Sequence, residues 1–189
     1  MADHRRFGQL AGWGTVSEAM TEPAVVRHVT ALMQEVAATF AVPAEIDVAA
    51  YQRSLLTRFA NSALPHRTAQ IAMDGSQKLP QRLFPPALTR CQSGRGSPRI
   101  ALAIAAWLHF LRGRSENGST LALDDPLAPR LKEAAAGTVS NSDLVDLIFR
   151  ISDVVPIALA QSSFRTEVLA ALDKLAANGV RETLLAMAP

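Results

Sequence analysis

The stretch IALAIAAWLHFL, at residues 100–111, decides the fold. Its twelve residues fall short of the roughly eighteen that a membrane-spanning helix needs. An arginine stands directly before it, another directly after it, and His109 lies inside it. An apolar run with charged ends is typical of a helix that is buried on all sides in a globular protein. We therefore expect a central helix over residues 98–111, with other helices packed around it.

Helical periodicity extends outward from this segment over most of the chain, whereas the alternation typical of strands is almost absent. Capping residues, prolines and glycines set the expected boundaries: Thr21 before Pro23, Asp47 before a second helix, and a left-handed Gly75 after a third. The predicted helices cover residues 23–42, 47–59, 66–73, 76–83, 98–111, 125–136, 141–151, 162–177 and 181–187. Loops are expected at 92–98 and 113–125. No repeat or long linker divides the chain, so we predict an all-α fold with a single helical domain over residues 1–189.

The composition excludes several classes of protein. Apolar residues make up 49% of the chain, which is too many for a disordered segment. The formal net charge of +2 and the 5% of aromatic residues argue against nucleic-acid binding. Cys91 is the only cysteine, which excludes an internal disulfide and a multi-cysteine zinc site. Because no segment resembles a signal peptide or a membrane span, we expect a cytoplasmic protein with no membrane partner.

The common catalytic motifs are absent. Gly8, Gly12 and Gly14 match neither a dinucleotide fingerprint nor a phosphate-binding loop, and we interpret them as small residues at a helix end and a turn. No G-x-S-x-G sequence occurs, and the four histidines are scattered, so no metal site is expected. Three arginines surround the 92–98 loop, where they could hold an anion; a solvated loop is the favoured interpretation.

The segment 58–83 concentrates polar residues among apolar helices. On a helix over 66–73, Arg67, Gln70 and Asp74 would share one face, and Lys78 follows the next turn. Such a cluster can bind hydroxyl groups or a carboxylate. The alternative is a set of caps and ion pairs that hold the corner, and the pattern alone favours this alternative.

This segment resembles the polyol-specific long-chain dehydrogenases, the mannitol dehydrogenase family. The resemblance covers nearly the whole chain and is most specific in QIAMDGSQKLP at residues 70–80, a version similar to that of fructuronate and tagaturonate reductases. It is further carried by Arg58-Phe59-x-Asn61, His66-Arg67-Thr68, Val16-Ser17-Glu18-Ala19-Met20, the run 101–111 and Asp125-Pro126.

The resemblance implies an NAD-dependent hydride transfer between a ketone and an alcohol, on a polyol or sugar acid of the mannitol, mannonate or altronate class. It implies that Lys78 contacts hydroxyls or the carboxylate of the sugar, that Gln70 binds a hydroxyl and that Arg67 supports a carboxylate. Asp74 is assigned to the turn and Asn61 to the corner after the second helix. Members of the family have a dinucleotide-binding domain and carry K-x-x-x-x-N-x-x-H on a helix, where Lys is the general acid/base.

The chain departs from the family at its N-terminal side. It lacks the dinucleotide-binding domain and the K-x-x-x-x-N-x-x-H signature, whose His would align near Met1, and His4 is out of register by about three residues. We therefore expect a C-terminal domain or fragment with no catalytic residue of its own, no NAD bound by the chain alone, and an upstream dinucleotide-binding segment as partner. We also expect Phe7, Leu10 and Trp13 to be bare and to promote self-association. The alternative is a non-catalytic helical module for protein interaction or oligomerisation.

Overall fold

The computed structural model describes residues 3–43, 45–64, 66–68 and 73–187. The described residues form helices and no strand, with two isolated bridges, so the all-α prediction is confirmed. The helices are α1 (Asp3–Ala11), α2 (Val16–Ala19), α3 (Pro23–Ala37), α4 (Val48–Ala60), α6 (Gly75–Arg82), α7 (Phe84–Gln92), α8 (Pro98–Leu111), α9 (Ala128–Ala136), α10 (Asn141–Phe149), α11 (Ile157–Ala160) and α12 (Phe164–Ala186).

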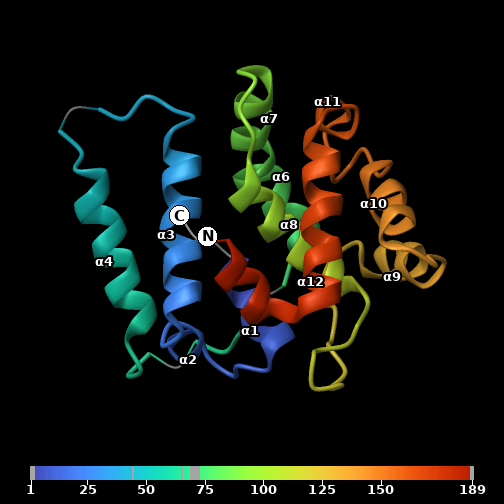
Figure 1. The fold of residues 1–189 in the computed structure, drawn as a ribbon, viewed down its shortest axis with the longest axis horizontal. Helices are drawn as coiled ribbons and strands as arrows, with labels where there is room; N and C mark the ends of the chain where they lie inside the picture. Colours follow the sequence, from blue (N-terminus) through green and yellow to red (C-terminus); the bar gives the residue numbers. More distant parts are fainter. Residues whose placement is uncertain (1–2, 44, 65, 69–72, 188–189) are drawn as a thin grey trace.

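The helices are arranged around α8. Figure 1 shows α3 and α4 as a pair on one side of the molecule, and α9, α10 and α11 on the other side. Helices α6, α7 and α8 lie between these groups, and α12 crosses in front of them. Helix α8 contacts α12, α1 and α3. The core therefore runs through the middle of the molecule, and α4 lies at its edge.

Helix α8 is buried as the sequence predicts, and its bounds match the predicted range 98–111. From Ile100 to Leu111, every residue except His109 is at most 5% exposed. Full burial of one large apolar side chain stabilises a fold by about 1.5–3 kcal/mol, so this helix supplies much of the hydrophobic stabilisation. Within the described part of the chain, no helix is long and apolar enough to cross a membrane.

Neighbouring helices cap the N-terminus of α8. The Glu35 carboxylate of α3 accepts hydrogen bonds from the backbone N–H groups of Arg99 and Ile100, at 3.2 and 2.9 Å. The Glu167 carboxylate of α12 accepts from the backbone N–H of Ser97 at 2.6 Å. Burial raises the pKa of Glu35, although these two backbone hydrogen bonds oppose the shift. The free donors at the start of α8 thus fix the positions of α3 and α12.

Helix α7 was missed by the sequence analysis. Pro85 and Pro86 occupy its first turn. The backbone N–H groups of a first turn have no acceptor within the helix, so the N–H that proline lacks costs no helical hydrogen bond. From the sequence, two consecutive prolines after residue 83 predict only the end of the preceding helix. Helix α6 does end at Arg82, but α7 begins two residues later and runs up to the predicted loop.

Three helix caps test the boundary predictions. Asp47 caps α4 as predicted, because its carboxylate accepts a backbone N–H of the first turn. The N-cap of α10 is Ser140, whereas the sequence predicts Asn141 or Ser142 as the cap, and Ser140 and Asp143 form a reciprocal capping box. The N-cap of α3 is Glu22 and not the predicted Thr21.

The prediction of a bare N-terminal stretch is wrong. Phe7 and Leu10 are completely buried, and Trp13 is half-buried. Both buried side chains belong to α1, which packs against α8, and the Phe7 ring meets the His28 ring edge-on at 5.1 Å. Other helices of the same domain cover this apolar stretch, so the stretch does not support the predicted self-association.

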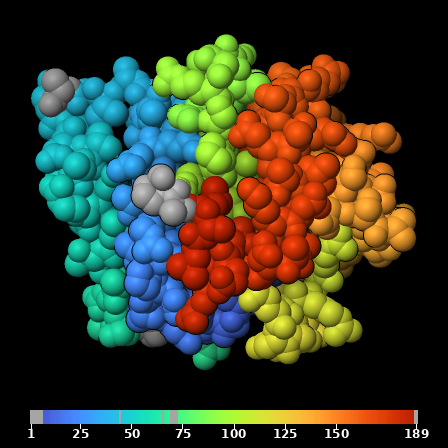
Figure 2. Space-filling model, viewed as in Figure 1, coloured from blue at the N-terminus to red at the C-terminus, as the bar shows by residue number. Residues whose placement is uncertain are grey.

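Helix α12 is kinked at Gly179, close to where the sequence predicts the end of one helix and the start of another. Gly179 has φ +76° and ψ 176°, a conformation that favours glycine. The Glu116 carboxylate accepts the backbone N–H of Val180 directly after the kink. The final segment of α12, red in Figures 1 and 2, therefore turns across the front of the molecule and lies against α3.

Candidate functional site

The turn that precedes α6 holds the polar corner predicted from the sequence. Asp74 is the N-cap of α6 and has φ 57° and ψ 37°, the left-handed conformation. The prediction had placed Gly75 in that conformation; Gly75 is instead the first residue of the helix. Asp74 makes no side-chain cap, so its carboxylate is available for another contact.

A neighbouring loop clamps this turn. The backbone N–H of Asp74 donates to the carbonyl of Asp124 at 3.0 Å. The buried Asp125 carboxylate accepts the Ser76 hydroxyl at 2.5 Å and the Ser76 backbone N–H at 2.8 Å, and it also accepts the N–H of Leu127. Sequence reasoning recorded Asp125 only as a helix start; nothing local shows a partner 49 residues away.

Lys78 lies one turn into α6 and points back to the corner. Its Nζ donates to the carbonyl of Met73 at 2.9 Å and lies 3.3 Å from the Asp74 carboxylate. The side chain of Lys78 is 24% exposed, and that of Asp74 is 43% exposed. Because an ammonium group has three donors, the two contacts leave one N–H for another partner. The structure thus contains the ion pair that the alternative interpretation required, and it also leaves Lys78 accessible.

The predicted helical face of three polar residues does not form as expected. Arg67 lies in an isolated antiparallel bridge with Thr15, and Asp74 is left-handed, so neither belongs to a helix over 66–73. The side chain of Arg67 is exposed. Gln70 lies outside the described residues. Asn61 acts as predicted after α4, since its side-chain oxygen accepts the N–H of Ala63 at 2.9 Å.

The segment before Gln70 is anchored to α1. The Thr68 side chain is buried; its hydroxyl accepts from the Gln9 amide at 3.0 Å and contacts the carbonyl of Trp13 at 2.8 Å. Gly8 faces the same side chain, and a Cβ at Gly8 would lie 2.6 Å from the Thr68 methyl group. The sequence analysis missed Gln9 and Thr68, because these contacts join positions 59 and 55 residues apart.

Two of the three arginines around the 92–98 loop donate to backbone carbonyls. Arg90 donates from Nε and Nη2 to the carbonyl of Gly96, at 3.0 and 2.6 Å. Arg99 donates to the carbonyl of Met187 at 2.7 Å. These two guanidinium groups hold backbone rather than face a free ligand.

His28 is buried and His109 is partly buried. Burial, with a smaller contribution from the Arg99 charge, lowers the pKa of His28 to about 3. Burial and the Arg112 charge also lower the pKa of His109. Neither ring nitrogen of His28 has a hydrogen-bond partner. Among the described residues, no group of three His, Cys, Asp or Glu side chains lies close enough to hold a metal ion.

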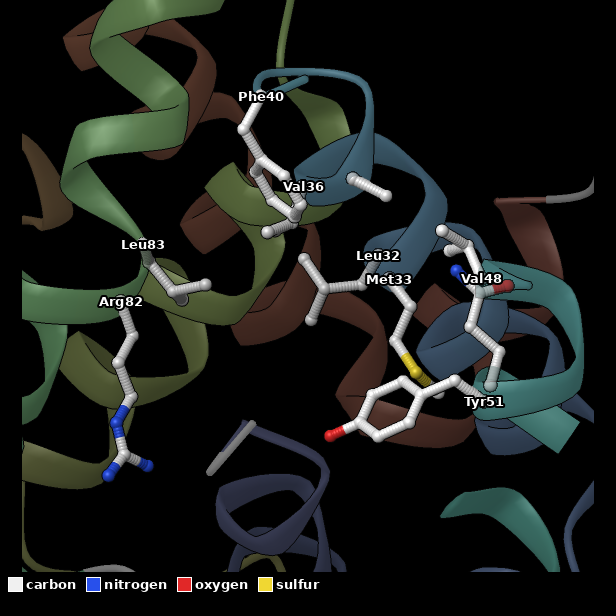
Figure 3. A pocket seen from close by; sticks show the side chains of 10 residues that line it. Leu32, Met33, Val36, Phe40, Val48, Tyr51, Arg82 and Leu83 are labelled. Atoms are coloured by element: carbon white, nitrogen blue, oxygen red, sulfur yellow. The ribbon is translucent and has the colours of Figure 1, made fainter. Parts of the chain in front are cut away.

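An apolar pocket lies between α3, α4 and the end of α6. It has a volume of about 230 Å³, and Figure 3 shows Leu32, Met33 and Val36 along its floor. Arg82 is the only charged side chain that lines it, and the Tyr51 side chain reaches into it from α4. With so few polar groups, this pocket does not suit a molecule that bears many hydroxyls.

The glycines near the N-terminus do not fit the phosphates of a dinucleotide. Gly8 makes room for Thr68, and Gly12 ends α1 with φ +82° beside Asn117. No strand leads into them in the described ranges, so the strand, glycine turn and helix of a dinucleotide site are not formed there. The prediction of a helix end and a turn is confirmed for Gly12 and Gly14, which follow α1, and is wrong for Gly8, which lies inside α1.

Known proteins with similar sequence and structure are oxidoreductases of polyols and sugar acids. The chain is 37% identical to the D-mannonate oxidoreductase of Escherichia coli over 96% of its own length and 37% of that protein. It is 27% identical to a solved Pseudomonas fluorescens mannitol 2-dehydrogenase, in a ternary complex with NAD and D-mannitol, with a TM-score of 0.91. That match covers 98% of this chain and 38% of the other.

A family model matches as well. The mannitol dehydrogenase C-terminal domain covers residues 6–176, which include part of α1, the polar corner, α8 and the first part of α12. The chain therefore spans little more than a third of the length of these relatives. On this match, the chain belongs to the mannitol dehydrogenase C-terminal domain family.

Proposed function

We propose that this chain is the substrate-side helical domain of an NAD-dependent oxidoreductase that interconverts a ketone and an alcohol on a polyol or a sugar acid. The observation that carries the proposal is the Lys78 amine, which is held at an ordered corner and keeps one donor free. The family supports it, because a related structure is a complex with NAD and D-mannitol and a related sequence is a D-mannonate oxidoreductase.

Three residues receive roles in substrate binding. Lys78 donates its free N–H to the sugar, because an ammonium group suits hydroxyl or carboxylate oxygens. We assign a substrate carboxylate to the exposed Arg67 and a substrate hydroxyl to Gln70, as the resemblance to the family implies. No catalytic residue is assigned within the 189 residues, because they contain no K-x-x-x-x-N-x-x-H sequence. Hydride transfer therefore requires a dinucleotide-binding partner segment, and we place the assembled protein in the cytoplasm.

A chimera tests the proposal. The rest of the E. coli D-mannonate oxidoreductase is joined to this chain in place of its own matched region. We expect NAD-dependent turnover of D-mannonate, whereas the 189-residue chain alone shows none, because general acid/base catalysis needs a positioned proton donor. Lys78→Met in the chimera should raise KM at least tenfold. Lys132→Met, which removes an exposed lysine on α9, is the control and should change nothing.

Two outcomes would reject the proposal. One is a folded chimera that binds neither D-mannonate nor D-mannitol. The other is a Lys78→Met chimera with unchanged KM for both compounds. Turnover by the isolated chain above that of a heat-killed sample would reject the assignment of catalysis to a partner segment.

A second candidate is a helical module for protein interaction or oligomerisation. It is favoured by three large apolar side chains, Phe40, Ile46 and Tyr51, each more than half exposed near the α3–α4 pocket. Sedimentation of the wild-type chain and of Phe40→Ser over a range of concentrations tests it. A monomer in both samples would exclude self-association through this surface.

A further inference from the structure

Asp74 has a left-handed backbone conformation, which Asp adopts only occasionally and glycine adopts readily. It is the only residue other than glycine with a positive φ in the described part of the chain. Glycine would fit this conformation without a steric penalty. Nor does Asp74 serve as a helix cap, because its side chain accepts no backbone N–H of α6. Neither usual reason for Asp at the start of a helix therefore explains it.

The clamp around the turn fixes where the Asp74 carboxylate lies. The carbonyl of Asp124 binds the backbone N–H of Asp74, and Asp125 binds Ser76 twice. These contacts hold the backbone of Asp74, and its side chain pairs with Lys78 rather than with a backbone N–H of α6. Strained residues that their surroundings hold in this way are common at binding sites.

The result is an acceptor beside a donor at one accessible place. The Asp74 carboxylate lies 3.3 Å from the Lys78 amine, and both side chains are partly exposed. Lys78 has one N–H left after Met73 and Asp74, and Asp74 has lone pairs left after Lys78. The formal charge of the pair is zero.

This combination matches neighbouring hydroxyl groups better than it matches a carboxylate. One hydroxyl can donate to Asp74 while the next accepts from Lys78, and an uncharged diol has no charge to balance. A carboxylate offers only acceptors and is repelled by Asp74. We propose that Asp74 and Lys78 together bind two adjacent hydroxyls of the substrate, and that Asp74 is the specificity-determining residue that keeps a carboxylate away from Lys78. This inference rests on the proposed function, since it concerns the same substrate site.

Titration of the full 189-residue chain with D-mannitol and with D-mannonate, followed by NMR, tests the inference. In Asp74→Asn we expect D-mannitol affinity to fall about fivefold, because a charged acceptor is lost. D-mannonate affinity should hold or rise, because Lys78 is left as an unbalanced cation. The ratio of the two affinities should shift about tenfold toward the acid.

Two further variants separate specificity from folding. Asp74→Gly suits the positive φ, so it should melt no lower than the wild type and still show the shifted ratio. Asp124→Asn is the matched control, because it removes a nearby exposed carboxylate that has no contact with Lys78. Its affinity ratio should stay at the wild-type value.

The outcomes distinguish this inference from the proposed function. An unchanged ratio in both Asp74 variants, with binding lost in Lys78→Ala, overturns the role of Asp74 and leaves the substrate site intact. An equal shift in Asp124→Asn also overturns it, since the effect would then be long-range charge. Absence of binding by the wild-type chain, or binding that Lys78→Ala leaves unchanged, overturns both.

Discussion

Helix α8 and the corner at residues 73–78 hold their shapes by different forces. Almost every side chain of α8 is buried among apolar neighbours, and its position depends on volume and area. The corner instead depends on a few directed hydrogen bonds from Asp124, Asp125 and Lys78 to a strained turn. Apolar burial, as in α8, tolerates small shifts and resists unfolding. Directed hydrogen bonds, as at the corner, fix the positions of the Lys78 amine and the Asp74 carboxylate. The comparison teaches that apolar burial fixes the centre of this domain, whereas directed hydrogen bonds fix the polar corner to which we assign substrate binding.

The largest effect is expected in the core. Leu102→Ala removes a completely buried side chain from the middle of α8. We expect a loss of about 3–5 kcal/mol in the free energy of unfolding, from lost burial and the cavity left behind. Urea denaturation measures it, with Val139→Ala as control because Val139 is 97% exposed. A loss below 1 kcal/mol would contradict the central role given to α8.

Acid should weaken the core through His28. Its folded-state pKa is lowered to about 3, while the unfolded chain binds the proton near pH 6.5. The stabilisation is therefore complete above pH 6.5 and is lost as the pH falls toward 3. The slope is about 1.4 kcal/mol per pH unit, or about 2.7 kcal/mol by pH 4.5.

Removing the imidazole should remove that part of the acid sensitivity. In His28→Leu we expect a flatter profile between pH 6.5 and 4.5 and no loss of stability at pH 7, because neither ring nitrogen is hydrogen-bonded. His66→Leu, at an exposed histidine, is the control. Parallel profiles for the wild type and His28→Leu would show that His28 accepts a proton while folded.

The clamp should matter less for global stability than α8 does. Asp125→Ala leaves the buried Ser76 hydroxyl and backbone N–H without their acceptor. We expect a loss of about 2–3 kcal/mol. Hydrogen exchange should speed up most at the start of α6, while the amides of α8 change less. Uniform acceleration over both helices would mean that the corner and the core unfold as one unit.

Gly8 lies on α1, which packs against α8, and it faces Thr68. Gly8→Ala places a methyl group against the Thr68 methyl, and we expect a cost of about 1–3 kcal/mol from overpacking. Thr68→Ser keeps the hydroxyl that binds Gln9 and removes the methyl. The double variant should therefore recover most of the loss. Additive losses in thermal melts of the four proteins would point to another cause.

The smallest effect on stability is expected at Lys78. Its pair with Asp74 is partly exposed, and such pairs contribute about 0–1 kcal/mol. Lys78→Ala should therefore melt close to the wild type, while sugar binding weakens by about 1.5–3 kcal/mol. Melting curves and binding titrations on the same sample check both. A destabilised variant with unchanged affinity would make Lys78 a purely structural residue.

Prediction from sequence succeeded where the signal was local. The apolar run fixed α8 to the residue, and Asp47 marked the start of α4. Prediction failed at Pro85 and Pro86, because proline can either follow the end of a helix or occupy the first turn of the next helix. The prediction also assigned the left-handed conformation to Gly75 instead of Asp74, because glycine is the usual left-handed residue.

The candidate site was predictable in part for the same reason. Lys78 stood out by its place after a turn, and the resemblance to a family supported it. Its contact with Asp74 follows from four-residue spacing on a helix. The clamp from Asp125 and the packing of Thr68 on α1 join residues about 50 or more positions apart, so no local pattern reveals them.

The kink at Gly179 has a consequence for synthesis of the chain. It returns Val180 and Leu184 to the interior, and the carbonyl of Met187 binds Arg99 at the start of α8. The central helix thus receives one of its neighbours from a segment that lies 88 residues further along the chain. During translation, α8 is synthesised before this segment, so part of its apolar surface has no neighbour until the segment follows. Contacts between residues so far apart in the sequence form slowly. Chaperone binding to nascent chains that end before residue 180 is the expected sign of that delay.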